Sequence, residues 1–182
     1  HINEDEFDLS YYTYGMSIYK NMPLIEPLET KEVKKIYEFV IVLDTSYSID
    51  EELAKRFLSN TYSILSTSNM FYKSCKVHII QCDDRIRKED VISNQHEMDR
   101  LLDSFTLVGG GNTDFRPAFS YVNDLVDQRV FQNLCGLLYF TDGKGIYPKK
   151  CPSYKTAFIY LEDYDQSKVP SWAIQYRLEE KL

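Results

Sequence analysis

The fold of this chain is decided by the stretch IYEFVIVL at residues 36–43 and by the DTSYS that follows it at residues 44–48. A nearly continuous apolar run of this length is typical of a β-strand in a sheet that is covered on both faces. The strand is expected to end at Asp44, where the polar residues begin. The stretch therefore predicts a buried central strand whose carboxyl end carries Asp and Ser side chains.

Strands and helices alternate along the rest of the chain. Further strands are predicted at residues 75–82, 136–141, 156–161 and 172–176, with a short edge strand at 85–88. Helices are predicted at residues 51–66, 96–105 and 117–126, the last with Pro117 in its first turn. This order is typical of a doubly wound α/β fold. We expect a mainly parallel, Rossmann-like central sheet with helices on both faces and one antiparallel edge strand.

Composition excludes several classes of protein. The chain has 182 residues, of which 43% are hydrophobic, and its 15 Tyr and 10 Phe argue against disorder. It carries 21 Lys and Arg against 28 Asp and Glu, a net charge of −7, with no basic block that would indicate a nucleic-acid surface. No apolar run approaches the roughly 18 residues of a membrane-spanning helix, so no span is expected.

The cysteines and the first residues indicate the compartment. The four cysteines are Cys75, Cys82, Cys135 and Cys151, and none is in a Cys-x-x-Cys pair. We interpret them as free thiols of a cytoplasmic protein rather than as disulfides or a zinc site. The first nine residues are acidic rather than basic, which is unlike a signal peptide.

Residues 1–35 differ from the rest of the chain. Four tyrosines lie between Tyr11 and Tyr19, and two prolines at positions 23 and 27 oppose a regular helix. We interpret residues 1–35 as an extended, aromatic lead-in from an absent upstream domain, and residues 36–182 as the α/β domain. The non-Met start also favours a piece of a longer protein.

Polar residues follow three of the predicted elements. They are DTSYS at residues 44–48, the NTD at 112–114 that ends a glycine loop, and TDG at 141–143. Each cluster alone also fits ordinary helix caps and turns. Ligands of open α/β sheets, however, bind at the carboxyl ends of strands, where these clusters are expected to meet. Carboxylates and hydroxyls are donors that suit a hard divalent cation such as Mg²⁺ or Mn²⁺.

The order and spacing of these residues resemble the metal-ion-dependent adhesion site of von Willebrand factor type A (VWA) domains. That site has Asp-x-Ser-x-Ser after the first strand, a Thr in a later loop and an Asp after the central strand. The matching metal ligands in this sequence are Asp44, Ser46, Ser48, Thr113 and Asp142. The resemblance implies a protein-binding domain in which a partner's acidic residue completes the coordination of the metal.

A narrower resemblance covers nearly the whole chain. GGGNTDFRP at residues 109–117 and NMPLIEPLE at 21–29 are similar to a bacterial VWA-like family whose longer members carry an N-terminal metallopeptidase-like domain. Similar proteins are often linked with MoxR-type AAA+ ATPases. The resemblance thus implies that this chain is the C-terminal part of a larger protein, with such an ATPase as a candidate partner.

One residue departs from the pattern. Tyr47 stands between the two serines, where such sites usually have a small residue. Its ring either covers the site, which leaves a VWA fold that binds partners without metal, or contacts a partner. The other candidate partner contacts are Asn112, Asp114 and Lys144.

Enzyme hypotheses fit the sequence less well, and no catalytic residue is predicted in this chain. His96-Glu97 is not followed by the x-x-His of a zinc peptidase helix. A phosphatase of the haloacid dehalogenase type would use Asp44 as nucleophile, but its general acid is replaced by Ser46. His78 lies in an apolar strand and is read as a core or sheet-face residue.

Overall fold

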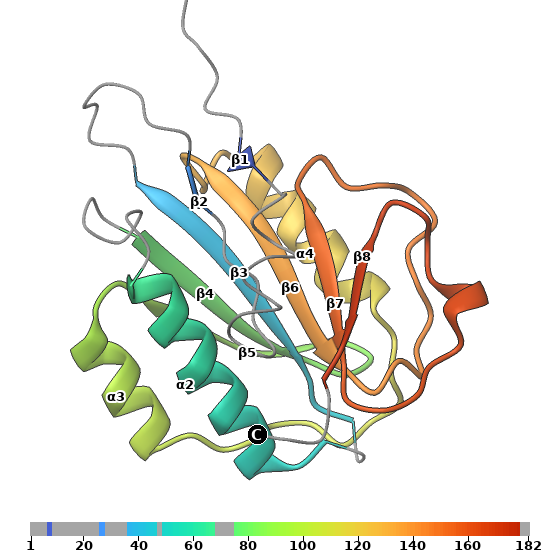
Figure 1. The fold of residues 1–182 in the computed structure, drawn as a ribbon, viewed down its shortest axis with the longest axis horizontal. Helices are drawn as coiled ribbons and strands as arrows, with labels where there is room; N and C mark the ends of the chain where they lie inside the picture. Colours follow the sequence, from blue (N-terminus) through green and yellow to red (C-terminus); the bar gives the residue numbers. More distant parts are fainter. Residues whose placement is uncertain (1–6, 9–25, 28–35, 47–48, 68–74, 179–182) are drawn as a thin grey trace, which may run out of the picture.

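The computed structural model describes residues 7–8, 26–27, 36–46, 49–67 and 75–178, and its main feature is a six-stranded sheet (Figure 1). The strand order is β5-β4-β3-β6-β7-β8. Neighbouring strands are parallel except for β4 and β5, which pair antiparallel. The bounds are β3 Tyr37–Asp44, β4 Cys75–Cys82, β5 Ile86–Ile92, β6 Leu134–Thr141, β7 Thr156–Tyr160 and β8 Ile174–Arg177.

Among the described residues, three α-helices cover the sheet. Helices α2 (Glu51–Thr67) and α3 (Gln95–Asp103) lie over one face, and α4 (Arg116–Asp127) lies over the other (Figure 1). A 3-10 turn spans Gln166–Lys168, and a separate antiparallel pair joins β1 (Phe7–Asp8) to β2 (Glu26–Pro27). The predicted fold class, a doubly wound and mainly parallel sheet with one antiparallel edge strand, is therefore confirmed. Most of residues 1–35, the predicted lead-in, lie outside the described residues.

Strand β3 explains why the decisive stretch is apolar without alternation. Phe39, Ile41 and Leu43 belong to the hydrophobic cluster under α2 and α3, whereas Val40 and Val42 belong to the cluster under α4. Each of these side chains is at most 1% exposed. Successive residues of a strand face opposite sides of the sheet, so a strand covered on both sides has no position for a solvated side chain.

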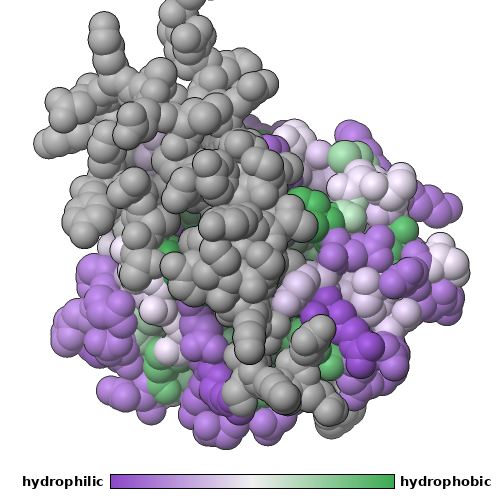
Figure 2. Space-filling view, in the orientation of Figure 1, coloured by the Kyte–Doolittle hydropathy of each residue, from purple (hydrophilic) through white to green (hydrophobic). Residues whose placement is uncertain are grey.

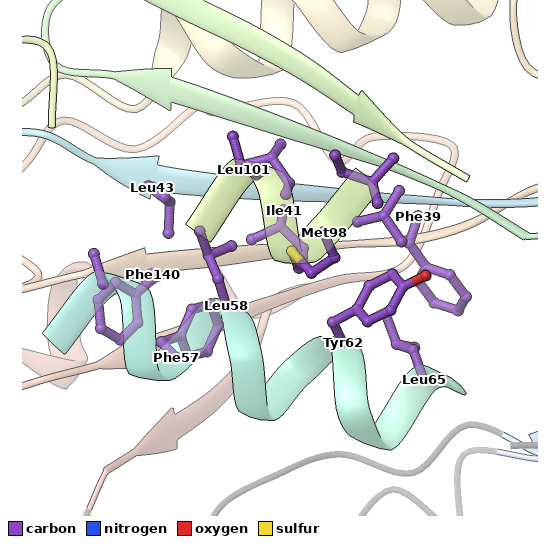
Figure 3. Close-up of a cluster of buried hydrophobic side chains, with 14 of the residues drawn as sticks. Phe39, Ile41, Leu43, Phe57, Leu58, Tyr62, Leu65, Met98, Leu101 and Phe140 are labelled. Carbon is purple, nitrogen blue, oxygen red and sulfur yellow. The ribbon is translucent and has the colours of Figure 1, made fainter. Parts of the chain in front are cut away.

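Helix α2 contributes the largest part of the first cluster (Figure 3). The ring of Phe57 in α2 stacks on the ring of Phe140 in β6, with the ring centroids 4.2 Å apart. Leu53 and Ile64 of this helix are only partly buried. The fully buried positions repeat every three or four residues, as expected for one helix face. They are Ala54, Phe57, Leu58, Thr61, Tyr62 and Leu65.

The edge strand is longer than predicted. The sequence analysis expected residues 85–88, but β5 runs from Ile86 to Ile92 and pairs with β4 from Cys82 to Val77. Its residues Arg87 to Asp90 are polar, because an edge strand that is only partly covered tolerates such side chains. The last strand is also shifted, from the predicted 172–176 to Ile174–Arg177.

The described surface is mostly hydrophilic. Figure 2 shows purple residues around small green areas on the face that carries α2 and α3. The large apolar side chains that are exposed among the described residues are Val91, Val108, Val130 and Ile146. Within the described part of the chain, no helix combines the length and apolar character needed to cross a membrane. The four cysteines are free, and Cys151 alone is exposed.

The first prediction concerns the stacked pair of Phe57 and Phe140. Phe57→Ala is expected to lower the free energy of unfolding by about 3–5 kcal/mol, because it removes a fully buried ring and leaves a cavity. Urea unfolding followed by circular dichroism measures this loss. Val130→Ala serves as the control, since Val130 is 47% exposed and its truncation is expected to change stability by less than about 0.5 kcal/mol. Equal losses for the two variants would contradict the packing described here.

Candidate metal centre

Two buried carboxylates meet at the carboxyl edge of the sheet. Strands β3 and β6 are parallel neighbours, with Leu43 opposite Phe140, so Asp44 and Asp142 emerge side by side. Asp44 is fully buried, and Asp142 is 3% exposed. Both carboxylates therefore lie at the same edge of the sheet.

Hydrogen bonds hold the Asp44 carboxylate in place. Its Oδ1 accepts from the backbone N–H of Ser46 at 2.9 Å, and its Oδ2 accepts from the Thr141 hydroxyl at 2.6 Å. The same hydroxyl oxygen accepts from the N–H of Gly143 at 3.1 Å. Asp44 therefore connects the ends of β3 and β6 and the turn that follows β6.

The electrostatic environment of Asp44 opposes its negative charge. Burial raises the pKa of its carboxyl, hydrogen bonds from Thr141 and Ser46 lower it in part, and the charge of Asp142 raises it again. The net direction is upward. A cation close to both carboxylates would compensate the burial and the mutual repulsion together.

Lys144 lies next to Asp142. Its backbone N–H donates to Asp142 Oδ1 at 3.0 Å, and its ammonium is 3.4 Å from Asp142 Oδ2 and 3.1 Å from Glu162 Oε2. Hydrogen bonding to Glu162 and the charge of Asp142 raise the pKa of Lys144. Since the Lys144 side chain is 63% exposed and shared between two acids, this ion pair is weak and easily displaced.

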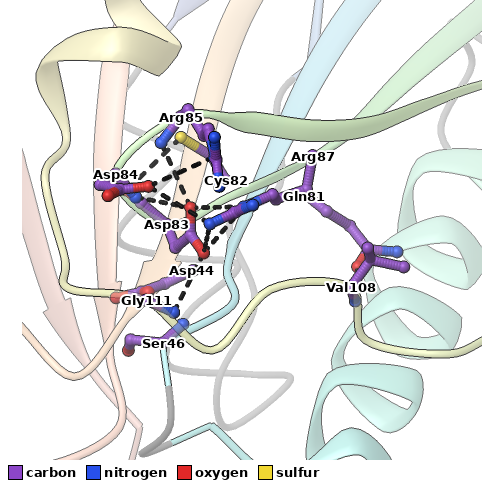
Figure 4. A network of polar contacts seen from close by, with 10 residues as sticks. All are labelled: Asp44, Ser46, Gln81, Cys82, Asp83, Asp84, Arg85, Arg87, Val108 and Gly111. Atoms are coloured by element: carbon purple, nitrogen blue, oxygen red, sulfur yellow. Dashed lines mark hydrogen bonds and ion pairs between the residues drawn. The ribbon is translucent and has the colours of Figure 1, made fainter.

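The glycine loop that carries Thr113 is fixed against these strand ends (Figure 4). The N–H of Gly110 donates to the carbonyl of Thr45 at 2.8 Å. Gln81, near the end of β4, accepts from the N–H of Val108 at 2.7 Å and donates to the carbonyl of Thr106 at 3.1 Å. Thr113 itself is half-buried, and the loop places it three residues after the contact with Thr45.

Asp83 completes the attachment of the loop. Its carboxylate is fully buried and accepts from the N–H of Gly111 at 3.1 Å, and its carbonyl accepts from the N–H of Asp114 at 3.1 Å. Arg87 Nε lies 2.7 and 2.9 Å from the two carboxylate oxygens. Burial alone raises the pKa of Asp83, but the hydrogen bonds from Arg87, Gly111 and Arg85 hold it well below its ordinary value.

The sequence analysis missed Gln81, Asp83 and Arg87, although a signal was present. Asp83 follows the end of β4 in the same way that Asp44 follows β3 and Asp142 follows β6. The only prediction for the segment after residue 82 is the short edge strand at 85–88, which assigns Asp83 no role. The rule that ligand-facing residues lie at the carboxyl ends of parallel strands applies to it equally.

The other residues predicted as metal ligands or partner contacts are in varied surroundings. Asn112 is exposed, and Asp114 is held by a bidentate ion pair with Arg116, whose Nη2 is 2.6 Å from Asp114 Oδ2. Ser48 and Tyr47, a predicted ligand and a predicted partner contact, lie outside the described residues. Among the predicted ligands that are described, the structure brings together Asp44, Ser46 and Asp142 and anchors the loop of Thr113 beside them.

The donors at this edge fit a hard cation. Asp44 and Asp142 are carboxylates, and Ser46 and Thr113 offer hydroxyls, which are oxygen ligands of the kind that Mg²⁺ prefers. No group of three or more His, Cys, Asp or Glu side chains suited to a metal occurs within the described ranges. The donor set at this edge is therefore poorly matched to zinc, which favours nitrogen and sulfur ligands.

Comparison with known families gives a match over most of the domain. A model of the family described as VWA-like domain (DUF2201) matches residues 39–179. The matched segment begins within β3 and ends just beyond β8, so it contains the six-stranded sheet except for Tyr37 and Glu38. A comparison with curated proteins gave no match.

Solved structures with a similar fold include three that differ widely in sequence. A von Willebrand factor type A structure from Catenulispora acidiphila is 9% identical, with a TM-score of 0.58, over 86% of this chain and 40% of that one. Proximal thread matrix protein 1 of the mussel byssus is 14% identical, with a TM-score of 0.53, over 78% and 41%.

An aerotolerance-related membrane protein from Bacteroides fragilis is 14% identical, with a TM-score of 0.51, over 79% of this chain and 92% of that one. The chain thus spans most of the length of this last structure but only about two fifths of the other two. At these identities the likeness concerns the fold alone.

The close seating of the glycine loop on β3 leads to the second prediction. A Cβ atom at Gly109 would lie 2.8 Å from Thr45 Cβ and 2.9 Å from the Thr45 carbonyl oxygen. Gly109→Ala is therefore expected to reduce the free energy of unfolding by about 1–3 kcal/mol through steric overlap. Urea unfolding tests this, with Asn112→Ala as a control at an exposed position of the same loop. A Gly109→Ala protein as stable as the wild type would show that the loop is not seated there.

Proposed function

Because the chain belongs to the VWA-like domain family, we propose that it is a protein-interaction domain that binds its partner through a divalent cation, Mg²⁺ or Mn²⁺. VWA-like folds are generally protein-interaction domains. The observation that carries the metal-dependent part is the pair of buried carboxylates of Asp44 and Asp142 at the ends of β3 and β6. The hydroxyls of Ser46 and Thr141 belong to the same strand ends.

In this proposal each residue has a definite role. Ser46, Ser48 and Thr113 ligate the cation through their hydroxyls, and Asp44 and Asp142 ligate it directly or through water. Two carboxylates balance the charge of a divalent ion, while neutral hydroxyls leave it able to accept a further anionic ligand. The bound metal supplies an electrophilic position that an acidic side chain of a partner protein can occupy.

The contacts of Asp44 support a binding role over a catalytic one. Its two oxygens are oriented by Ser46 and Thr141, so the carboxylate is a fixed part of the strand ends. A phosphatase reaction would need a second acid two residues later, and that position is Ser46. We therefore propose no reaction at this edge.

Two exposed apolar residues add to the proposed interface. Val108 is 41% exposed in the loop that carries Thr113, and Ile146 is 53% exposed in the segment after Asp142. The backbone of Val108 contacts Gln81 near the end of β4, and the segment of Ile146 follows the end of β6. Both therefore lie at the carboxyl edge of the sheet, where the partner's acidic residue is expected. Apolar side chains are typical of the buried part of protein interfaces.

The wider context of the domain is also part of the proposal. The resemblance of the GGGNTDFRP loop and the 21–29 segment supports a longer protein with an N-terminal metallopeptidase-like domain, and a MoxR-type AAA+ ATPase as partner. The free cysteines fit a cytoplasmic location. Affinity capture with and without Mg²⁺, using Asp142→Ala as the control, tests the proposed partner directly.

The third prediction tests the metal itself. Saturating Mg²⁺, at about 100 times the dissociation constant, is expected to stabilise the protein by about 2.7 kcal/mol. For a domain of this size that corresponds to a rise in melting temperature of about 5–10 °C. Asp44→Ala and the isosteric Asp142→Asn are expected to abolish the rise, measured by differential scanning fluorimetry.

Asp127→Asn is the matched control, because Asp127 is exposed at the end of α4. It should retain the full Mg²⁺ effect. If millimolar Mg²⁺ or Mn²⁺ leaves the wild type unchanged, the metal-dependent proposal fails and the metal-free form of the VWA fold is the better account.

The fourth prediction concerns Lys144. Its ammonium lies near Asp142 and repels a divalent cation there, so Lys144→Gln is expected to tighten Mg²⁺ binding by about threefold to tenfold. Glu162→Gln should weaken binding, since it removes the other acid that holds Lys144 away from Asp142. Isothermal titration calorimetry at low salt measures both changes. Weaker binding by Lys144→Gln would contradict the competition between the two cations.

A further inference from the structure

Asp83 and Arg87 form a buried ion pair beside the candidate metal centre (Figure 4). The Asp83 side chain is fully buried, and the Arg87 side chain is 22% exposed. Arg87 Nη2 lies 2.7 Å from Asp83 Oδ2, and its Nε contacts both carboxylate oxygens. Two donors of a planar guanidinium fix the carboxylate more firmly than a single donor does.

The carboxylate of Asp83 also receives backbone hydrogen bonds. The N–H groups of Asp84 and Arg85 donate to Oδ1 at 2.7 and 3.2 Å, and that of Gly111 donates to Oδ2 at 3.1 Å. With these three donors and Arg87, both oxygens are occupied. Asp83 is therefore not available as a metal ligand itself, although it lies at the same edge of the sheet as Asp44 and Asp142.

The two contacts of Asp83 with the glycine loop enclose Thr113. Its carboxylate accepts from Gly111 and its carbonyl accepts from Asp114, so only residues 112 and 113 lie between the two held positions. The space at Gly111 is tight, because an added Cβ would lie 2.9 Å from Asp83 Oδ2. Asp83 thus controls the backbone on both sides of the proposed ligand.

We infer that Asp83, oriented by Arg87, is a positioning residue that sets the hydroxyl of Thr113 against the metal centre. This inference rests on the proposed metal-dependent function. A ligand on a loop binds well only when its backbone is held in the productive position, and residues that orient ligands typically change metal affinity by about 10- to 100-fold when replaced.

The test uses two measurements on the full chain. Mg²⁺ affinity is measured by isothermal titration calorimetry, and amide hydrogen exchange without metal reports on residues 105–114. Arg87→Gln is expected to weaken Mg²⁺ binding by about tenfold and to accelerate exchange in this loop while α2 and β3 keep their protection. Arg87→Lys keeps the positive charge but loses the paired N–H donors of the guanidinium. Its Mg²⁺ affinity and its rate of loop exchange are expected to lie between those of Arg87→Gln and the wild type.

Two further variants separate positioning from general stability. Gly111→Ala leaves both charges intact and displaces the loop from Asp83, so it is expected to weaken Mg²⁺ binding as Arg87→Gln does. Arg116→Gln is the control, because Arg116 forms the other Arg–Asp pair of this loop but is exposed and pairs only two residues away. It should leave both the affinity and the exchange of the loop unchanged.

The outcomes are distinct. Faster loop exchange together with weaker Mg²⁺ binding supports the inference. Faster exchange with unchanged affinity, or unchanged exchange in Arg87→Gln, overturns it. If the wild type binds no Mg²⁺, the proposed function fails first and the positioning role fails with it, and the exchange data then show whether Asp83 has only a structural role.

Discussion

The burial of β3 on both faces is the constraint on which the rest of this structure depends. From Phe39 to Leu43, β3 lies between two layers of helices and carries apolar side chains, while its charged residues lie near its two ends. Glu38 accepts from the backbone N–H groups of Gln132 and Asn133 near the start of the strand. Asp44 is the charged group at the carboxyl edge of the sheet. That group is itself fully buried and must be stabilised locally. The Thr141 hydroxyl and the Ser46 N–H do this, and they join the ends of the two central strands.

Burial of the strand also determines the polar groups at the end of β4, the neighbour of β3. Strand β4 is buried over most of its length, and its end also carries polar side chains, Gln81 and Asp83, that are fully buried. Their hydrogen-bonding groups are satisfied by the backbone of the glycine loop, which in this way is attached to the sheet at several points. Buried polar groups that need partners thus determine where an otherwise irregular loop lies.

The sequence predicts a feature well when the feature depends on neighbouring residues in the chain. It predicts a feature poorly when the feature depends on contacts with residues that are distant in the sequence. The nearly continuous apolar run at residues 36–43 has the length and the β-branched residues of a doubly covered strand, and the fold class follows from it together with the alternation of strands and helices. The polar β5 was predicted too short, because its strand character comes from pairing with β4 rather than from its own side chains. Asp83 was missed because its role depends on Gly111 and Asp114, which are about 30 residues away in the sequence.

Charge compensation distinguishes the three acids at this edge of the sheet. Asp83 has a close partner in Arg87, whose Nε and Nη2 both contact its carboxylate and whose side chain is half-buried. Asp142 has Lys144, but that ammonium is mostly exposed and shared with Glu162. The hydrogen-bond partners of Asp44 among the described residues, Ser46 and Thr141, are neutral. The compensation is thus weakest between Asp44 and Asp142, and a divalent ion would stabilise the protein most at this position.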